Sequence, residues 1–336
     1  MARDARALRV EVRREDYPLK IPFRISGYVF RTTPCVIVTL ERNGHVGRGE
    51  AEGVYYLDDT ADRAADTIRH LAAQLSPTLT RDELQEILPP CGARNALDCA
   101  LWDLEAKEAG RPVWELAGLP PPRALLTTQT LGAEDPGVMA QAAAGFAAFH
   151  ALKLKLTGET DTDIARVRAV RQARPDVWIG VDANQGYSPR TIEPLLGVLV
   201  ECRVALLEQP FRRGAEADMD EVEFPVPVAA DESCVSLSEL DAIAPRFDVV
   251  NIKLDKCGGL TEGLQIAHRA KSLGMDVMVG NMTGGSLAMA PSFVVGQLCD
   301  VVDLDGPTFL ADEPAPRVDY TDGHISCGPE LWGGGK

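Results

Sequence analysis

Two lysines interrupt one of the most apolar segments of this sequence. In ALKLKL (151–156), Lys153 and Lys155 are two residues apart, so on a β-strand both ammonium groups point to one face while the leucines point to the other. A third lysine, Lys253, stands in the similar segment VVNIKLD. Like charges disfavour two adjacent ammonium groups, so one member of the pair can lose its proton nearer neutral pH. The lysines are therefore candidates for acid–base chemistry.

Carboxylates follow other short apolar segments. They are Asp182 in WIGVDAN, Glu208 in VALLEQP and Asp231 in VPVAADES. Each alone has an ordinary explanation, because an aspartate after a strand often caps the next helix. Together they form a hard oxygen site, too small for a calcium cage but suited to Mg²⁺, which keeps open positions for water and substrate. The sequence therefore predicts a magnesium site flanked by the lysines.

These residues can meet only if the segments that carry them converge. Helical patterns alternate with eight β-rich segments: LTTQTLG, ALKLKL, WIGVDAN, VALLEQP, VPVAADES, VVNIKLD, DVMVGNM and VVDLDGP. We expect the helices at 136–149, 160–174, 188–200, 236–244, 259–273 and 286–297. This alternation favours parallel βαβ units, and eight strands favour a closed (β/α) barrel over an open sheet. The active site of such an α/β fold lies where the carboxyl ends of the strands meet.

The first part of the chain has a different pattern. It contains two segments rich in β-branched residues and two helical patterns, at 7–12, 35–40, 59–75 and 93–109. We expect an α+β domain over residues 1–118, separated from a barrel over 119–310 by the proline-rich LPPPRA.

Composition excludes several classes of partner. The 336 residues include 34 Lys and Arg against 50 Asp and Glu, and the formal net charge of -16 repels nucleic acid and anionic membranes. The N-terminus lacks the apolar core of a signal peptide, and the eight cysteines form no CxxC pair. We expect a cytoplasmic enzyme that acts on a small molecule, with neither a disulfide framework nor a zinc site.

Five blocks of the sequence resemble the signatures of a known family. In order, KLKL, VDANQGY, LLEQP, ADES and NIKLDKCGG are similar to those of the enolase superfamily, in its muconate-lactonizing subgroup, and the resemblance covers nearly the whole chain. It implies a (β/α)7β barrel under a capping domain that the C-terminal tail, residues 311–336, completes. It also implies that Asp182, Glu208 and Asp231 bind Mg²⁺, and it places Asn184 at the substrate.

The resemblance also gives each lysine a role. Lys155 is the base on one face of the substrate, Lys253 stands on the opposite face, and Lys153 helps to hold the substrate carboxylate. A proton α to a carboxylate is too weakly acidic for an ordinary lysine of pKa about 10.4, so the metal must stabilise the enediolate. Two bases on two faces produce a 1,1-proton transfer, which inverts the carbon. The seventh segment, DVMVGNM, lacks the histidine of mandelate racemase relatives, and this disfavours that subgroup.

The eighth strand indicates the substrate. Asp303 and Asp305 in VVDLDGP share a strand face, and DLDGP resembles the motif with which dipeptide epimerases hold the substrate ammonium group. Two features depart from that pattern: Gly284 and Gly285 follow the seventh strand, and Tyr28 stands where the relatives specific for Ala-Glu carry an arginine.

Other residues near Tyr28 bear on the side chain of the substrate. Arg24 and Arg31 are close enough in sequence to meet an acidic side chain. We expect the loops at 24–31 and 52–59 to determine side-chain specificity.

Several alternatives share the same machinery. An N-acylamino acid racemase, for example one acting on N-acetylglutamate, needs the same lysines but has no ammonium group for the two aspartates to bind. A lyase of the o-succinylbenzoate synthase kind or a cycloisomerase would also keep the metal site. A catalytically silent metal-binding barrel is the alternative outside enzymes, and the intact lysines speak against it. Members of the superfamily commonly pair across subunits, so a homo-oligomer is possible.

Overall fold

The computed structural model, which describes residues 8–25 and 28–335, confirms the predicted barrel. Eight strands form one parallel sheet in the order of the chain. They are β7 (Gln129–Leu131), β8 (Ala151–Lys155), β9 (Trp178–Asp182), β10 (Leu206–Glu208), β11 (Val228–Ala230), β12 (Val249–Ile252), β13 (Asp276–Val279) and β14 (Val301–Val302). The amide of Thr128, next to β7, donates to the carbonyl of Val302 at 3.0 Å and closes the barrel.

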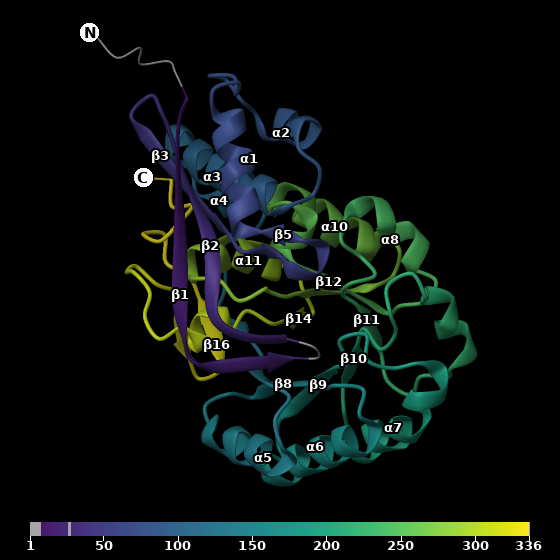
Figure 1. The fold of residues 1–336 in the computed structure, drawn as a ribbon. Coiled ribbons are helices and arrows are strands. Elements are labelled where there is room, and N and C mark those ends of the chain that lie inside the picture. Colours follow the sequence, from purple (N-terminus) through teal and green to yellow (C-terminus); the bar gives the residue numbers. More distant parts are fainter. Residues whose placement is uncertain (1–7, 26–27, 336) are drawn as a thin grey trace.

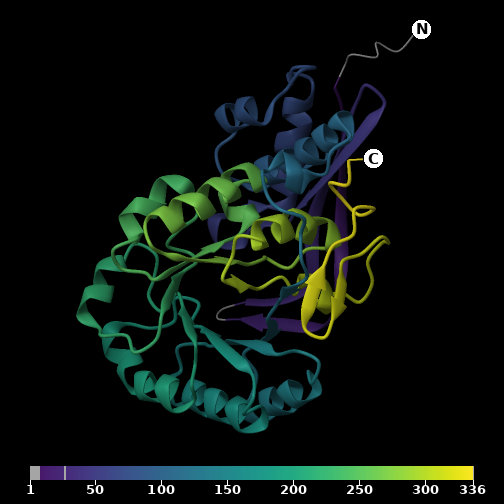
Figure 2. The ribbon, with the colours of Figure 1, turned by 180° about the vertical axis from the view of Figure 1, so that it is seen from behind.

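Helices surround the strands on the outside, as both views show (Figures 1 and 2). They are α5 (Pro136–Gly145), α6 (Thr160–Ala173), α7 (Pro189–Glu201), α8 (Leu237–Ile243), α9 (Leu254–Cys257), α10 (Leu260–Ser272) and α11 (Ser286–Gly296). Short 3-10 helices η2 (Glu216–Glu221) and η3 (Gly306–Phe309) follow β10 and β14. Six of these elements match the helices predicted from periodicity to within a few residues, because each has a buried stripe that packs on the strands.

The cap is an antiparallel sheet covered by helices. Its elements are β1 (Arg9–Ile25), β2 (Tyr28–Arg42), β3 (His45–Ala51), β4 (Gly53–Val54), η1 (Tyr55–Leu57), β5 (Asp59–Thr60), α1 (Ala61–Ala72), α2 (Arg81–Ile87), α3 (Gly92–Ala109) and α4 (Val113–Leu116). Asn43 and Gly44 have φ of 53° and 81° and make the tight turn between β2 and β3. Helix α3 lies so close to β3 that a Cβ at Gly49 would be 2.1 Å from the carbonyl oxygen of Ala96.

The prediction of a loop at 24–31 is largely wrong, because most of these residues belong to two paired strands. Strand β1 continues to Ile25 and β2 begins at Tyr28, with Arg24 paired to Val29 and Phe23 paired to Phe30; residues 26–27 lie outside the described part of the chain. Alternating apolar side chains let the two strands pair beyond the cap sheet, so the hairpin extends from the cap to the barrel (Figure 1).

Contacts on both strands of the hairpin region attach it to the barrel, and two of them lie near its tip. The Phe23 and Phe309 rings lie 5.0 Å apart, and the amide of Ala133 donates to the carbonyl of Arg24 at 3.2 Å. The hairpin therefore covers part of the barrel mouth.

The C-terminal segment contacts both domains. Strand β15 (Asp319–Thr321) pairs with β16 (His324–Ser326), which in turn pairs with β6 (Leu125–Leu126) beside the barrel. Beyond them, the amide of Gly333 donates to Asp103 of α3 at 2.7 Å, and the Trp332 indole donates to the carbonyl of Arg48 at 2.9 Å. No helix within 8–25 and 28–335 is long and apolar enough to cross a membrane.

Candidate active site

The lysine pair lies on β8 as its alternation predicts. The Nζ atoms of Lys153 and Lys155 lie 3.2 and 2.6 Å from the same oxygen, Oδ2 of Asp182 on the neighbouring strand. The opposite face of the strand is fully buried and consists of Leu152, Leu154 and Leu156. Burying three leucines in the layer under the helices fixes the register of β8, so both ammonium groups must point into the barrel mouth.

The three predicted metal ligands converge from adjacent strands. Asp182 and Glu208 are the last residues of β9 and β10 and are paired in register, and Asp231 follows β11 directly. One oxygen from each carboxylate lies within 4.8 Å of the other two, and all three side chains are buried. Three carboxylates this close repel one another in the absence of cations, and hard oxygen donors of this number suit Mg²⁺. The donor set therefore fits a divalent cation.

The carboxylates of this triad differ in charge state. Burial raises the pKa of Asp182, but the ammonium groups of Lys155 and Lys153 outweigh burial and lower it to about 2. Burial and the neighbouring Asp182 together raise the pKa of Glu208 to about 7. For Asp231, burial is outweighed by Lys253 and Lys256, which hold its pKa far below the ordinary value. Glu208 is thus the member that depends most on a further cation for its charge.

Lys153 remains charged because carboxylates surround it. Burial lowers the pKa of Lys153, but Asp303, Glu208 and Asp182 together raise it well above the ordinary value; the Nζ–oxygen distances are 2.9, 2.7 and 3.2 Å. This differs from the expectation that packing against Lys155 would dominate, because carboxylates outnumber lysines around Lys153. Lys155, by contrast, is within ion-pair distance of a single carboxylate among the described residues.

The third lysine lies across the barrel from this pair. Lys253 follows β12, and the sheet order places β12 four strands from β8 in a closed set of eight. Its Nζ lies 2.7 Å from Oδ2 of Asp231, and this carboxylate raises the pKa of Lys253 although burial lowers it. The two predicted bases therefore approach the centre of the mouth from opposite sides.

The two aspartates after β14 face the same mouth. Asp303 contacts Lys153 and accepts a hydrogen bond from Thr128 Oγ1 at 2.5 Å, while Asp305 accepts one from the amide of Thr130 at 2.6 Å. Burial raises the pKa of Asp303, but Lys153 outweighs it and keeps the pKa below the ordinary value. Burial and Asp303 raise the pKa of Asp305 to about 7. The pair thus offers one firmly charged carboxylate and a second that an arriving cation would ionise.

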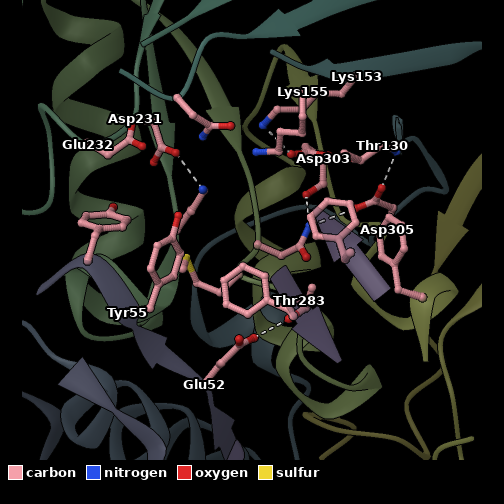
Figure 3. A pocket seen from close by; sticks show the side chains of 18 residues that line it. Glu52, Tyr55, Thr130, Lys153, Lys155, Asp231, Glu232, Thr283, Asp303 and Asp305 are labelled. Atoms are coloured by element: carbon pink, nitrogen blue, oxygen red, sulfur yellow. Dashed lines mark hydrogen bonds and ion pairs between the residues drawn. The ribbon is translucent and has the colours of Figure 1, made fainter. Parts of the chain in front are cut away.

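The three lysines, Asp231 and the two aspartates after β14 line one pocket, with about 660 Å³ of empty space that includes its opening to solvent. Figure 3 shows Asp231 and Glu232 on one side of it, Asp303 and Asp305 on the other, and Lys153 and Lys155 between them. The cap contributes Glu52 and Tyr55, so the pocket lies between the two domains. The full lining consists of Phe23, Phe30, Glu52, Tyr55, Tyr56, Thr130, Lys153, Lys155, Asn184, Asp231, Glu232, Lys253, Asn281, Met282, Thr283, Asp303, Asp305 and Phe309.

The remaining predicted residues are placed differently. Asn184 lines the pocket, and its side-chain oxygen is buried and has no hydrogen-bond partner among the described residues. Tyr28 does not line the pocket but packs against Tyr55, which does, with ring centroids 4.5 Å apart. Arg24 is half exposed, pairs with Glu134 at 3.1 Å and does not line the pocket.

Sequence reasoning missed several residues that support the site. Lys256 is buried and donates to Oδ1 of Asp231 at 2.6 Å, and Asn251 donates to Oε1 of Glu208 at 2.9 Å. Asn251 could have been found, because it precedes Lys253 by two residues and the backbone at Lys253 continues the extended conformation of β12, so the two side chains share a face. Lys256 lies in the sequence block NIKLDKCGG. The direction of its side chain depends on the short helix α9, which the hydrophobic periodicity of the sequence did not predict.

Fold and site together define a class: capped (β/α) barrel enzymes with a carboxylate metal site at the mouth. Two family models match the chain, the N-terminal domain of mandelate racemase / muconate lactonizing enzyme over residues 7–118 and the enolase C-terminal domain-like model over residues 137–327. The protein therefore belongs to the enolase superfamily. The resemblance seen in the sequence blocks is confirmed.

Relatives of this chain include epimerases and racemases. An L-Ala-D/L-Glu epimerase of Escherichia coli (strain K12) is 37% identical over 318 residues, which cover 94% of this chain and 98% of that protein. An N-acetyl-D-glutamate racemase of Pseudoalteromonas sp. is 37% identical over 294 residues, 85% of this chain and 91% of that one. The crystal structure of a dipeptide epimerase from Enterococcus faecalis V583, complexed with Mg and L-Leu-L-Tyr, has a TM-score of 0.87 and 27% identity, covering 96% of this chain and 97% of that one.

Proposed function

We propose that this protein is a Mg²⁺-dependent epimerase that inverts the carbon α to the carboxylate of a dipeptide. The observation that carries the proposal is the placement of Lys155 and Lys253 on opposite sides of one carboxylate triad. A one-base enzyme needs a single group on one face, whereas inversion needs a donor and an acceptor on two faces. The arrangement supports a cap over residues 1–118, a barrel over 119–310 and a closing tail over 311–336.

Asp182, Glu208 and Asp231 would hold the metal. A magnesium ion bound there polarises the substrate carboxylate and stabilises the negative charge that develops when the α-proton leaves. The dipeptide epimerase of Enterococcus faecalis complexed with Mg supports this cofactor for a chain of the same fold. Lys153, which the surrounding carboxylates keep charged, would orient the substrate carboxylate beside the triad.

Lys155 and Lys253 would carry the proton. With the substrate α-carbon between them, the uncharged lysine on one face takes the α-proton and the ammonium group on the other face returns one, which inverts the centre. Each lysine contacts a carboxylate of the triad, at 2.6 Å for Lys155 and 2.7 Å for Lys253.

Asp303 and Asp305 would select a dipeptide. Their carboxylates lie at the edge of the pocket that Figure 3 shows opposite Asp231, and a free ammonium group there would gain two charge-assisted hydrogen bonds. An N-acyl substrate has no charge to offer at this position. The relative of Escherichia coli that epimerises L-Ala-D/L-Glu supports the same choice.

A second candidate is racemisation of an N-acylamino acid. The N-acetyl-D-glutamate racemase of Pseudoalteromonas sp. has the same 37% identity as the dipeptide epimerase, over 85% of this chain against 94%, and this favours the alternative. An N-acylamino acid racemase would use the same metal site and both bases, so these features do not distinguish it from a dipeptide epimerase.

Proton NMR in D₂O separates them. The protein with Mg²⁺ is incubated with L,L-dipeptides and with N-acetyl amino acids, and the α-proton signals are followed. We expect loss confined to the C-terminal residue of some dipeptides. Loss only in N-acetyl substrates would replace the proposal by the racemase, and no loss anywhere would contradict both.

A further inference from the structure

The short helix α9 connects the metal site with the cap. Lys253, the residue just before this helix, lies 2.7 Å from Asp231 of the carboxylate triad. Two residues later, Asp255 contacts the cap instead: its Oδ1 accepts hydrogen bonds from the main-chain amides of Glu52 and Gly53, at 2.9 and 2.8 Å. One predicted base and one attachment point of the cap therefore belong to the same short segment.

The two amides that Asp255 holds stand at the start of a small hairpin of the cap. Gly53 of β4 pairs with Thr60 of β5, and η1 forms the tip between these strands. Tyr55 and Tyr56 of η1 line the pocket. Figure 3 shows Tyr55 on the side of the pocket where Asp231 lies. The base of the hairpin is thus fixed to the barrel, and its tip forms a wall of the pocket.

Asp255 is buried and does not itself line the pocket. Burial raises its pKa to about 6 and the Gly53 amide opposes this shift, so the carboxylate is charged at neutral pH and both hydrogen bonds are charge-assisted. Thr283 Oγ1 also contacts this segment, at 2.5 Å, but through the side chain of Glu52. Asp255 takes the main chain, so it determines where the base of the hairpin lies relative to Lys253.

Other contacts join the cap to the same part of the barrel without reaching the pocket. Arg94 of α3 donates to the carbonyls of Cys257 and Gly258, at 2.6 and 3.1 Å. The indole of Trp102, also on α3, donates to Thr261 Oγ1 at 3.0 Å. None of these five residues lines the pocket. The two domains would therefore stay attached through α3 if the contact at Asp255 were lost.

We propose, building on the epimerase function proposed above, that Asp255 is a positioning residue for the reaction. Through two main-chain amides of the cap it holds Tyr55 and Tyr56 at the side of the pocket where Lys253 pairs with Asp231. Without this contact the hairpin moves relative to α9, so the substrate loses one wall of its pocket and water enters beside the base. A misplacement of about 1 Å in such a wall can cost about 10² in rate.

The first test separates this role from a purely structural one by kinetics with Mg²⁺, on the dipeptide that exchanges fastest in D₂O. Asp255→Ala should lower kcat/KM at least tenfold, chiefly by raising KM. Asp255→Asn keeps an acceptor for the amides and should recover most of this loss. Trp102→Phe is the matched control: it removes a buried hydrogen bond between the same domains and should lower stability while leaving KM within twofold.

An unchanged KM in Asp255→Ala, or an equal rise in KM in Trp102→Phe, would overturn the role of Asp255. Asp255→Asn as impaired as Asp255→Ala would exclude the amide hydrogen bonds as its cause. Absence of α-proton exchange in the unaltered protein would instead contradict the epimerase function.

The second test does not depend on turnover. Hydrogen–deuterium exchange followed by mass spectrometry measures the amides of residues 52–60, which should exchange at least tenfold faster in Asp255→Ala and at the original rate in Trp102→Phe. Unchanged exchange in Asp255→Ala would overturn the positioning role, whatever the activity. Should Asp255→Ala not fold, Asp255→Glu takes its place, because it keeps the charge but displaces the acceptor oxygens by one methylene group.

Discussion

Lys256 and Asp231 form a buried ion pair in which the Nζ atom lies 2.6 Å from Oδ1, while Lys253 takes the other oxygen of the same carboxylate at 2.7 Å. Lys256 also donates to the main-chain carbonyls of Asp231 and Asn251, at 2.5 and 2.9 Å. All three of its protons are therefore used by the protein. This leaves Lys253 as the lysine at Asp231 that is free to exchange its contact for the substrate.

Replacing Lys256 should show that it positions Asp231. Lys256→Met keeps the volume but removes three hydrogen bonds, and breaking a buried pair typically costs about 3–5 kcal/mol in the free energy of unfolding. We also expect weaker Mg²⁺ binding by calorimetry, because Asp231 loses its orientation. Arg269→Met, which removes an exposed pair with Asp241, should change neither quantity noticeably. Unchanged unfolding and Mg²⁺ binding in Lys256→Met would contradict this role.

Each predicted base should be indispensable for inversion. Lys155→Ala and Lys253→Ala should each lower kcat for epimerisation by about 10²–10⁴ or more, because each removes one of the two proton carriers. Exchange of the α-proton with D₂O should survive for opposite enantiomers of the substrate in the two variants. Lys271→Ala, on the exposed surface of α10, is the control. Substantial epimerisation in either active-site variant would refute the two-base assignment.

Removal of the metal should abolish activity and lower stability. Treatment with EDTA should stop turnover, and adding Mg²⁺ at about 100 times its Kd should raise the free energy of unfolding by about 2.7 kcal/mol. Glu208→Gln removes one of three ligands and should reduce this increase measured by thermal unfolding. Glu201→Gln, in an exposed pair with Arg168, should leave it unchanged. Equal stabilisation of the Glu208→Gln protein by Mg²⁺ would exclude Glu208 as a ligand.

Asp305 should matter more for dipeptides than for N-acyl substrates. Asp305→Asn keeps the shape and the acceptor for the Thr130 amide but removes the charge that would hold an ammonium group. We expect KM for the best dipeptide to rise at least tenfold, since hydrogen bonds to charged groups contribute about 1.5–3 kcal/mol. Any exchange with N-acetyl amino acids should change much less. An equal loss of activity with dipeptides and with N-acetyl amino acids would show that Asp305 does not act by binding the ammonium group.

Stability should depend on pH through Glu50, which joins the cap to the barrel. Its Oε1 accepts a hydrogen bond from the amide of Gly285 at 2.6 Å, and burial raises its pKa from 4.5 to about 7. The folded state therefore binds more protons than the unfolded state between these values, so this group costs stability as the pH rises from about 4.5 to 7.

Glu50→Gln removes this titration and should separate it from the rest of the protein. Relative to the unaltered protein, the variant should gain up to about 3 kcal/mol in the free energy of unfolding as the pH rises across that window. Urea denaturation at several pH values measures the difference. A difference that stays constant from pH 4.5 to 7 would contradict the raised pKa of Glu50.

Much of the site follows from the sequence because strand alternation and strand order are local properties. Lys153 and Lys155 had to share a face once β8 was a strand, and the ends of parallel strands had to meet once eight βαβ units closed. The charge state of Lys153 did not follow. Its nearest carboxylates come from residues 29, 55 and 150 positions later in the chain, and only closure of the barrel brings them together.

The cap shows the same division. Segments rich in β-branched residues and apolar residues at helical spacing predicted the strands and helices of the cap. The extension of β1 and β2 over the barrel depends instead on contacts between distant segments, such as Phe23 with Phe309. By itself the sequence determined the fold class, the family and the set of charged residues at the barrel mouth, because these depend on periodicity and order. Only the tertiary structure decided that Arg24 lies outside the pocket and that Phe30, Tyr55 and Glu52 enter it, because those positions depend on how the cap packs on the barrel.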